Sequence, residues 1–208
     1  MNYRSAATTL LVLSASAIAQ DRMPPIPADK LTPAQKHVLE IVTAPPRGPA
    51  AAAGPFVPLL RSPELMNRLQ AVGGYLRFNN SLPPKLVEIA ALMTARQFTQ
   101  QYEWDGNYPL ALKAGLPPDV ANAIGAGRRP DKLADDEEPV YNFISELLQN
   151  KSVSDPTYAR MVAKYGEQGV IDAAGLVGYY STLAMIMNVA RSPAQPNSTA
   201  PKLIHLPH

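Results

Sequence analysis

Residues 82–116 constrain the fold of this 208-residue chain more than any other segment. The segment starts with two prolines, a residue type that is favourable in the first turn of a helix. Apolar side chains then recur at the i, i+3, i+4, i+7 spacing that places them on one helix face. They are Leu86, Ile89, Ala90 and Met93, and Val87 and Leu92 widen the stripe. We therefore expect a helix that is buried on most of its sides.

Similar helix signals recur along the chain. Thr32, Ser62 and Ser154 each precede a first turn that contains proline, where a hydroxyl side chain can cap a helix. Residues 167–191 are the most apolar segment, and their small side chains suit the middle of a bundle or an oligomer interface. No segment shows the alternating pattern of a strand. The sequence predicts an all-α fold, a compact bundle of about six helices.

The 22 prolines gather at residues 23–58 and 193–207, which indicates extended flanks around a folded middle. We expect a Pro-rich leader with one short helix over residues 20–61, a helical domain over 62–191 and a flexible, solvated tail over 192–208. Within the leader, residues 43–58 contain too many prolines and glycines for a regular helix. Long loops of this kind often cover a site, and a flexible linker fits the composition equally well.

Residues 1–19 have the layout of a secretory signal peptide. Arg4 supplies a positive start, an apolar run follows, and Ala17-Ile18-Ala19 forms a small-x-small cleavage pattern. This layout predicts export to the periplasm or the medium after cleavage near Ala19, while the alternative is the N-terminal helix of a cytoplasmic protein. In no later segment do we find the eighteen or more apolar residues of a membrane span, so we expect none.

Charge and cysteine content exclude several kinds of function. The formal net charge of +2 is spread along the chain, so we expect no nucleic-acid partner. The chain has no cysteine, which excludes thiol nucleophiles, peroxidatic thiols and thiolate metal sites. The acidic run at residues 135–138 is expected to meet the dipole at a helix N-terminus rather than to bind a metal. We expect neither a metal nor an organic cofactor.

Four polar side chains stand out within residues 82–116. Glu88 lies inside the apolar helix, where a carboxylate is costly to bury unless it is paired or protonated. Gln100, Glu103 and Asn107 follow at i, i+3 and i+7, on one face of the next helical segment. These four side chains are the first candidates for a functional site.

The same segment resembles the carboxymuconolactone decarboxylase family, which belongs to an all-α superfamily that also holds alkyl hydroperoxidase D. The resemblance covers about residues 62–191 and implies a bundle of the alkyl hydroperoxidase D type that forms a homo-oligomer, a trimer or larger. It is carried by Leu82-Pro83-Pro84 leading into LVEIAALMTAR, by Tyr102-Glu103-Trp104, by Pro109-Leu110-Ala111, by Lys113-Ala114-Gly115-Leu116 and by AAGLVGYYSTLAMIMNVAR, which is similar to the family's last core helix.

In relatives of hydroperoxidase D the working groups are a Glu, a Cys-x-x-Cys pair and a His. The matching positions here are Glu88 for the Glu, Gln100 and Glu103 for the two Cys, and Asn107 for the His. Because both thiols are absent, thiol peroxidase and disulfide reductase mechanisms are chemically excluded. The decarboxylase-like branch lacks the Cys pair and keeps Tyr-Glu-Trp, and Tyr102-Glu103-Trp104 matches this motif.

The resemblance implies a cofactor-free decarboxylase, or a related enzyme acting on a lactone or another small organic acid. Glu88 or Glu103, with a pKa raised by burial, would deliver a proton to the carbanion or dienolate, and Asn107 would hydrogen-bond the enolate oxygen. The substrate-binding side chains expected beside these catalytic ones are Arg96, as the clamp for a carboxylate, with Gln100, Tyr102 and Trp104.

A structural interpretation of the same residues stays open. Glu88 and Arg96 lie about 80° apart around a continuous helix and can form a buried pair, and Trp104 can belong to the core. The protein would then be a catalytically silent helical binding or scaffold protein. A single pocket containing Glu88, Arg96, Glu103 and Asn107 favours the enzyme, and scattered side chains favour the scaffold.

Overall fold

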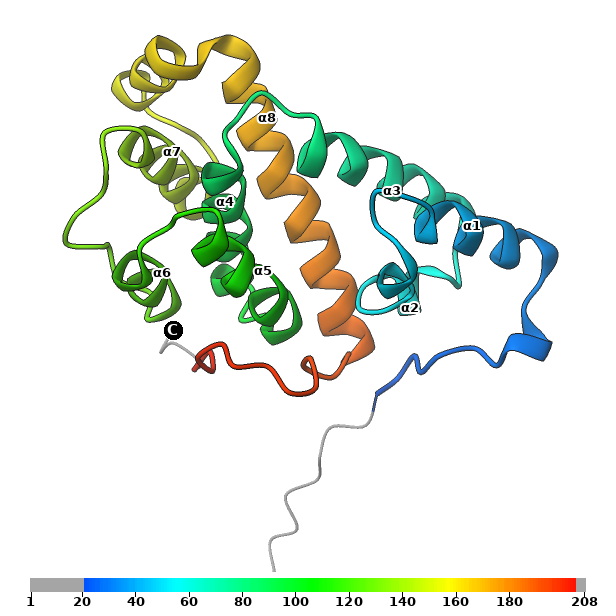
Figure 1. Cartoon of the computed structure of the whole chain (residues 1–208). Helices are drawn as coiled ribbons and strands as arrows, with labels where there is room; N and C mark the ends of the chain where they lie inside the picture. The colour runs from blue at the N-terminus through cyan, green and yellow to red at the C-terminus, as the bar shows by residue number, and fades with distance from the viewer. Residues whose placement is uncertain (1–20, 205–208) are drawn as a thin grey trace, which may run out of the picture.

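A computed structural model describes residues 21–204, which fold into helices without a β-strand (Figure 1). The predicted all-α class is confirmed. The α-helices of this part of the chain are α1 (Pro33–Thr43), α2 (Phe56–Leu59), α3 (Pro63–Phe78), α4 (Pro84–Gln97), α5 (Gln101–Lys113), α6 (Pro118–Gly125), α7 (Glu137–Asn150) and α8 (Asp155–Ala190). These eight exceed the expected six or so, partly because α2 is a four-residue helix inside a proline-rich loop.

Prolines and caps determine where the helices begin. The Thr32 hydroxyl accepts a hydrogen bond from the Gln35 N–H at 3.3 Å, and the Gln35 side chain accepts one from the Thr32 N–H at 3.0 Å. This capping box starts α1. Ser62 and Ser154 occupy the N-cap positions of α3 and α8, but their side chains make no capping bond. At these two starts the first-turn prolines, whose φ is already near the helical value, favour the helix.

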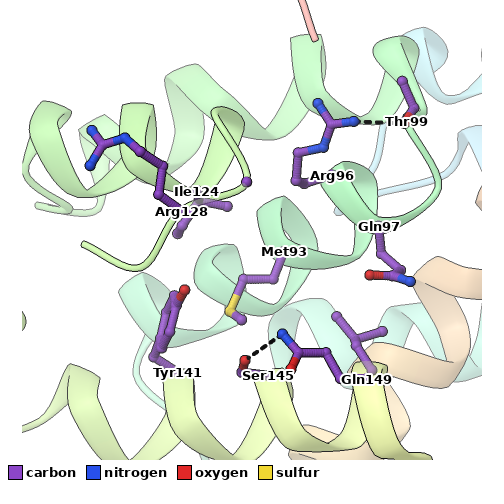
Figure 2. Close-up of a pocket in the computed structure, with 11 residues that line it drawn as sticks. Met93, Arg96, Gln97, Thr99, Ile124, Arg128, Tyr141, Ser145 and Gln149 are labelled. Atoms are coloured by element: carbon purple, nitrogen blue, oxygen red, sulfur yellow. Dashed lines mark hydrogen bonds between the residues drawn. The ribbon is translucent and has the colours of Figure 1, made fainter. Parts of the chain in front are cut away.

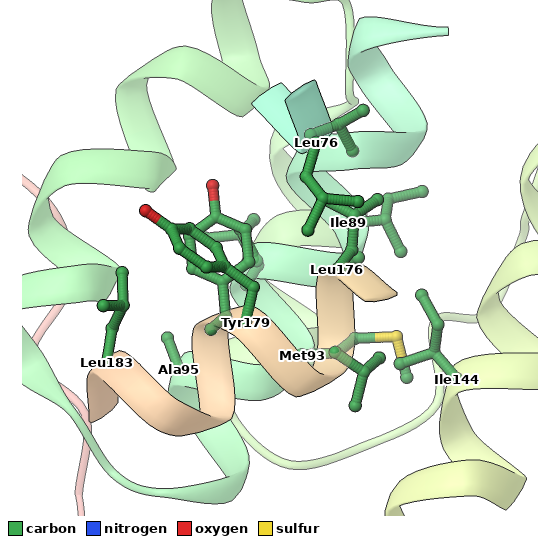
Figure 3. Packing of buried hydrophobic residues seen from close by; sticks show 14 of the residues in the cluster. Leu76, Ile89, Met93, Ala95, Ile144, Leu176, Tyr179 and Leu183 are labelled. Atoms are coloured by element: carbon green, nitrogen blue, oxygen red, sulfur yellow. The ribbon is translucent and has the colours of Figure 1, made fainter. Parts of the chain in front are cut away.

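Helix α8 runs through the middle of the molecule (Figure 1). It packs against α4 and α7 on one side and against α3 and α2 on the other, while α5 and α6 pack against α4. The predicted apolar stripe of α4 is fully buried, since Leu86, Ile89 and Leu92 have no exposed surface. Figure 3 shows the apolar side chains of four helices meeting in one core, among them Leu76, Ile89, Met93, Ile144, Leu176 and Leu183.

Helix α8 changes direction at Gly166, where φ is 67° and ψ is 178°. Glycine reaches this conformation without the strain that a Cβ would add. The chain is helical on both sides of the bend, and the apolar part that follows it crosses the core.

The expectation that no segment is long and apolar enough to span a membrane is wrong for α8. This 36-residue helix contains an 18-residue window with a mean hydropathy of 1.4, enough by length and composition to cross a bilayer. Glycine, serine and tyrosine interrupt the apolar run in α8, and the window nevertheless reaches this average. In the structure 56% of that window is buried inside the molecule, as is usual for a core helix.

Residues 43–58 are packed onto the helices. Phe56 and Leu59 of α2 are buried, and the Arg47 guanidinium donates a hydrogen bond to the carbonyl of Gln70 in α3 at 3.0 Å. Arg47 also lies over the ring of Phe56, with its Cζ 5.5 Å from the ring centroid. Of the two interpretations of this segment, the covering loop agrees with this packing.

The segment after α8 was expected to be a solvated tail, but residues 192–204 lie along α5. Asp105 of α5 accepts hydrogen bonds from the Gln195 N–H at 3.1 Å and from the Ser198 hydroxyl at 2.7 Å. The Leu203 N–H donates to the side chain of Gln101 at 2.8 Å. Polar anchors on α5 hold this path together with Ala200 and Leu203, which pack against the core. The predicted signal peptide, residues 1–19, lies outside the described residues.

Candidate active site

Glu103, in the first turn of α5, is a buried carboxyl group without a partner. The residue is 5% exposed, and neither carboxyl oxygen has a hydrogen-bond partner among the described residues. Burial raises the pKa of Glu103 well above its ordinary value, and the nearby Arg77 lowers it only in part. The shift favours the protonated, neutral form of Glu103, which can donate a proton.

Gln100 determines where α5, and with it Glu103, begins. Its side-chain oxygen accepts a hydrogen bond from the Tyr102 N–H at 2.8 Å, which makes Gln100 the N-cap of α5. Its side-chain amide donates to Asn188 of α8 at 2.7 Å. Gln100 was predicted to bind substrate, but in the structure it joins α5 to α8.

Glu88, on α4, is a second carboxyl group whose pKa is shifted upward. Its Oε2 atom is buried without a hydrogen-bond partner in residues 21–204. Burial raises the pKa of Glu88 to about 7, and Arg77 again opposes the shift. Glu88 therefore exchanges its proton near neutral pH. It lines neither of the cavities described below, so it can act on their contents only through a neighbouring group.

The cation that acts on both carboxyl groups is Arg77, in the last turn of α3. Its own pKa is raised, most strongly by its proximity to Tyr180, against the opposing effect of burial. Within residues 21–204, no Arg77 nitrogen lies within 4.0 Å of a carboxyl oxygen of Glu88 or Glu103. The guanidinium is therefore close enough to influence both acids without being neutralised by a direct ion pair.

Two adjoining cavities flank Arg77. The first, of about 190 Å³, is lined by Arg77 together with Tyr102, Glu103, Asn107, Tyr180 and Gln195. The second, of about 240 Å³, extends from Arg77 toward Tyr179 and the covering loop. Pro55, Arg77 and Leu183 line both cavities, so the two spaces adjoin at the guanidinium.

Tyr180 and Asn107 place hydrogen-bonding groups beside Glu103. The Asn107 amide donates to the backbone carbonyl of Glu103 at 2.7 Å, and the Tyr180 hydroxyl donates to the Asn107 side-chain oxygen at 3.5 Å. Burial raises the pKa of Tyr180, so its phenol stays protonated. The second amide N–H of Asn107 and the weakly held phenol can donate to an oxygen on which negative charge develops.

Tyr102 closes one wall of the first cavity. Its ring packs against Gly54 of the covering loop, and its backbone carbonyl accepts a hydrogen bond from the side chain of Gln195 at 3.1 Å. The covering loop and the C-terminal segment thus meet α5 at the same residue. Gln195 was not predicted to line a site, because nothing in a proline-rich tail indicates where it docks.

Trp104 lies in the core. It has no exposed surface and lines neither of the two cavities around Arg77. Its ring centroid lies 5.5 Å from that of Tyr108, and its indole nitrogen has no hydrogen-bond partner in the described part of the chain. Of the Tyr102-Glu103-Trp104 motif, only the first two residues face the cavity.

Arg96 lies apart from the two carboxyl groups. It forms no ion pair with Glu88, and its two hydrogen bonds go to the Thr99 hydroxyl at 2.7 Å and the Gly125 carbonyl at 3.3 Å. Eight residues advance a helix by about 12 Å, which separates Glu88 from Arg96 along the axis although they share a side. Arg96 lines a third cavity that has no residue in common with the first two.

The acidic run at residues 135–138 lies at the N-terminus of α7, with Glu137 and Glu138 in its first turn. Glu137 and Asp136 pair with Lys85 of α4 at 2.8 and 3.1 Å. Across residues 21–204, no three His, Asp or Glu side chains are grouped so that they could hold a metal ion.

Sequence reasoning missed Arg77 and Tyr180. A single arginine in the last turn of a helix is favourable with the helix dipole, so Arg77 carried no distinct signal. Tyr180 did carry one, because two adjacent tyrosines interrupt an otherwise apolar helix. Buried tyrosine hydroxyls need hydrogen-bond partners, which makes such a pair a pointer to a polar cavity.

The chain matches no protein-family model, and no similar curated protein was found. The resemblance to the decarboxylase family therefore rests on the quoted motifs.

Proposed function

We propose that the protein is a cofactor-free enzyme of the carboxymuconolactone decarboxylase type, with a bundle of the alkyl hydroperoxidase D kind. It acts on an unsaturated lactone acid or a related small organic acid, at the cavities around Arg77. The observation that carries the proposal is Glu103, a buried carboxyl group that lines a cavity together with Arg77. Within residues 21–204 its oxygens have no hydrogen-bond partner, and no carboxylate forms an ion pair with Arg77. The predicted signal peptide would place the reaction outside the cytoplasm.

In the proposed reaction, Arg77 attracts the organic acid into the cavity. The bond between the carboxylate carbon and the ring carbon breaks, carbon dioxide leaves, and the electron pair moves into the conjugated system to give a dienolate. Tyr180 and Asn107 donate hydrogen bonds to the dienolate oxygen. Glu103 gives its proton to carbon and is reprotonated from solvent, with Glu88 as the group that exchanges protons near neutral pH.

A comparison of acids with their esters tests the binding part of this proposal. Unsaturated lactone acids are expected to raise the melting temperature of the wild-type protein, and their methyl esters are not, because Arg77 recognises the anion. The substitution Arg77→Gln should remove the shift. Arg68→Gln is the matched control, since Arg68 lies on the same helix and is an exposed partner of Glu64.

Turnover of an acid that binds tests the chemistry. Glu103→Gln should lower the rate of carbon dioxide release by about 10²- to 10⁴-fold, the usual contribution of a positioned acid. Full turnover in both Glu103→Gln and Glu88→Gln would exclude the acid–base mechanism. If the wild type neither binds nor consumes any lactone acid, the silent binding or scaffold protein is the better account.

A further inference from the structure

A third cavity, of about 300 Å³, lies between α4, α6 and α7 (Figure 2). It shares no residue with the cavities around Arg77, and none of its lining residues is acidic. The proposed reaction makes no use of it. Its walls combine polar and apolar side chains, among them Met93, Arg96, Gln97, Tyr141, Ser145 and Gln149.

Arg96 is the buried cation of this cavity. The residue is only 6% exposed, and its two hydrogen bonds go to neutral groups, the Thr99 hydroxyl and the Gly125 carbonyl. A guanidinium has five N–H groups, so three of these lack a partner within residues 21–204, and the Nε atom is one of them. In this part of the chain no carboxylate pairs with Arg96. Burying a charge is costly unless it is paired, so an anion bound in this cavity would stabilise Arg96.

The neighbouring arginines do not share this environment. Arg128 is exposed at the rim, and Figure 2 shows its guanidinium pointing away from the cavity. Arg129 is exposed and bonded to Glu138 at 3.0 Å and to Asn142 at 2.5 Å. Arg96 is therefore the cation that an anion inside the cavity would meet.

We propose that this cavity is a second ligand site, which binds a small carboxylate with an apolar body. The carboxylate group accepts hydrogen bonds from Arg96, whose planar N–H groups match its geometry. The apolar body lies against Met93, Ile124 and Leu148, which line the same space. The volume is at the lower end for ligand pockets, which limits the occupant to a small molecule. A free phosphate offers the same charge but has no apolar body to place against these side chains.

Titration calorimetry with benzoate, its neutral counterpart benzamide, and inorganic phosphate tests this assignment. Benzoate should bind the wild-type protein more tightly than either of the other two. Arg96→Gln should weaken benzoate binding about 10- to 100-fold, the usual effect of losing a charged hydrogen bond. Arg129→Gln, which removes an exposed arginine next to the cavity, should leave the affinity unchanged.

Two further variants separate this site from the Arg77 cavities and from a folding defect. Because benzoate is a small organic acid that the Arg77 cavities could also hold, the binding that belongs to the third cavity is the part that Arg77→Gln retains and Ser145→Phe loses. Ser145→Phe should fill the cavity from α7 without changing Arg96, and it should also weaken benzoate binding. This variant provides the test if Arg96→Gln is poorly folded. The proposal is overturned if benzoate fails to bind the wild type at millimolar concentration, if phosphate binds more tightly than benzoate, or if Arg77→Gln rather than Ser145→Phe loses binding.

Discussion

Glu88 and Glu103 both hold protons more tightly than ordinary carboxyl groups because the fold removes them from water. Burial is the largest influence on both, and Arg77 opposes it in both. The pKa of Glu88 is raised to about 7, and that of Glu103 is raised well above its ordinary value. At the scale of single residues, two buried acids thus share the influence of one cation.

Glu88 should make the stability of the protein depend on pH. Its pKa is higher in the folded than in the unfolded chain, so the folded state binds more protons between about pH 4.5 and 7. The free energy of unfolding should therefore fall as pH rises through this window, by at most about 1.4 kcal/mol per pH unit. Glu103, whose pKa is also raised by burial, adds its own share to this slope from the same lower limit. Glu88→Gln should therefore reduce the slope below pH 7 in urea titrations without abolishing it. An unchanged slope in Glu88→Gln would show that Glu88 is solvated.

Gly73 of α3 provides a second test at this scale. A Cβ at Gly73 would overlap the hydroxyl and ring of the buried Tyr179, whereas a Cβ at Gly74 would have open space around it. Gly73→Ala should destabilise the protein by about 1–3 kcal/mol, as overpacking does. Gly74→Ala should stabilise it by up to about 1 kcal/mol, because alanine is the better helix former. Urea denaturation of both variants gives the comparison, and two stabilised variants would mean that Tyr179 moves freely.

At the scale of elements, the candidate site depends on segments that have little structure of their own. The covering loop supplies Pro55, and the segment after α8 supplies Gln195. Both are held by side chains of the helices, the loop through Tyr102 and the tail through Asp105. Neither attachment is visible in the sequence, since the segments they join are more than forty residues apart.

Asp105→Ala should release the C-terminal segment. Asp105 is buried and accepts hydrogen bonds from Gln195, Ser198 and Gln101, so its loss leaves these donors without an acceptor. Limited proteolysis should then cleave within residues 192–204 faster than in the wild type, while global stability falls by only about 1–2 kcal/mol. Asp131→Ala, at an exposed acid, is the control. Equal cleavage rates in the two variants would show that Asp105 does not hold the tail.

Helices were predicted well because their signals are local. First-turn prolines, the Thr32 cap and the apolar spacing of α4 each act within a few residues, and all of them appear in the structure. Glu88 and Glu103 could be selected because a carboxylate inside an apolar pattern is conspicuous. Arg96 was placed wrongly in the same cluster because the angle around a helix was considered without the rise along it.

At the scale of the whole molecule, the site combines side chains that are far apart in the sequence. Arg77, Glu103 and Tyr180 line the first cavity and come from α3, α5 and α8, whereas Glu88 of α4 lines none of the three cavities. Helices α3 and α4 pack against α8, and α5 packs against α4. Which side chains meet in such a cavity depends on helix packing, not on sequence spacing. For this reason Arg77 and Tyr180 were found only in the structure, whereas the motif residues were found in the sequence.

The central place of α8 also has a consequence for how the protein is made. Chains emerge from the ribosome N-terminus first, so α3, α4 and α5 are synthesised before the helix that fills the space between α3 and α4. Until α8 arrives, the apolar faces of α4 and α7 that it covers have no partner. A growing chain that pauses before that point exposes an apolar surface that is prone to aggregate or to bind a chaperone.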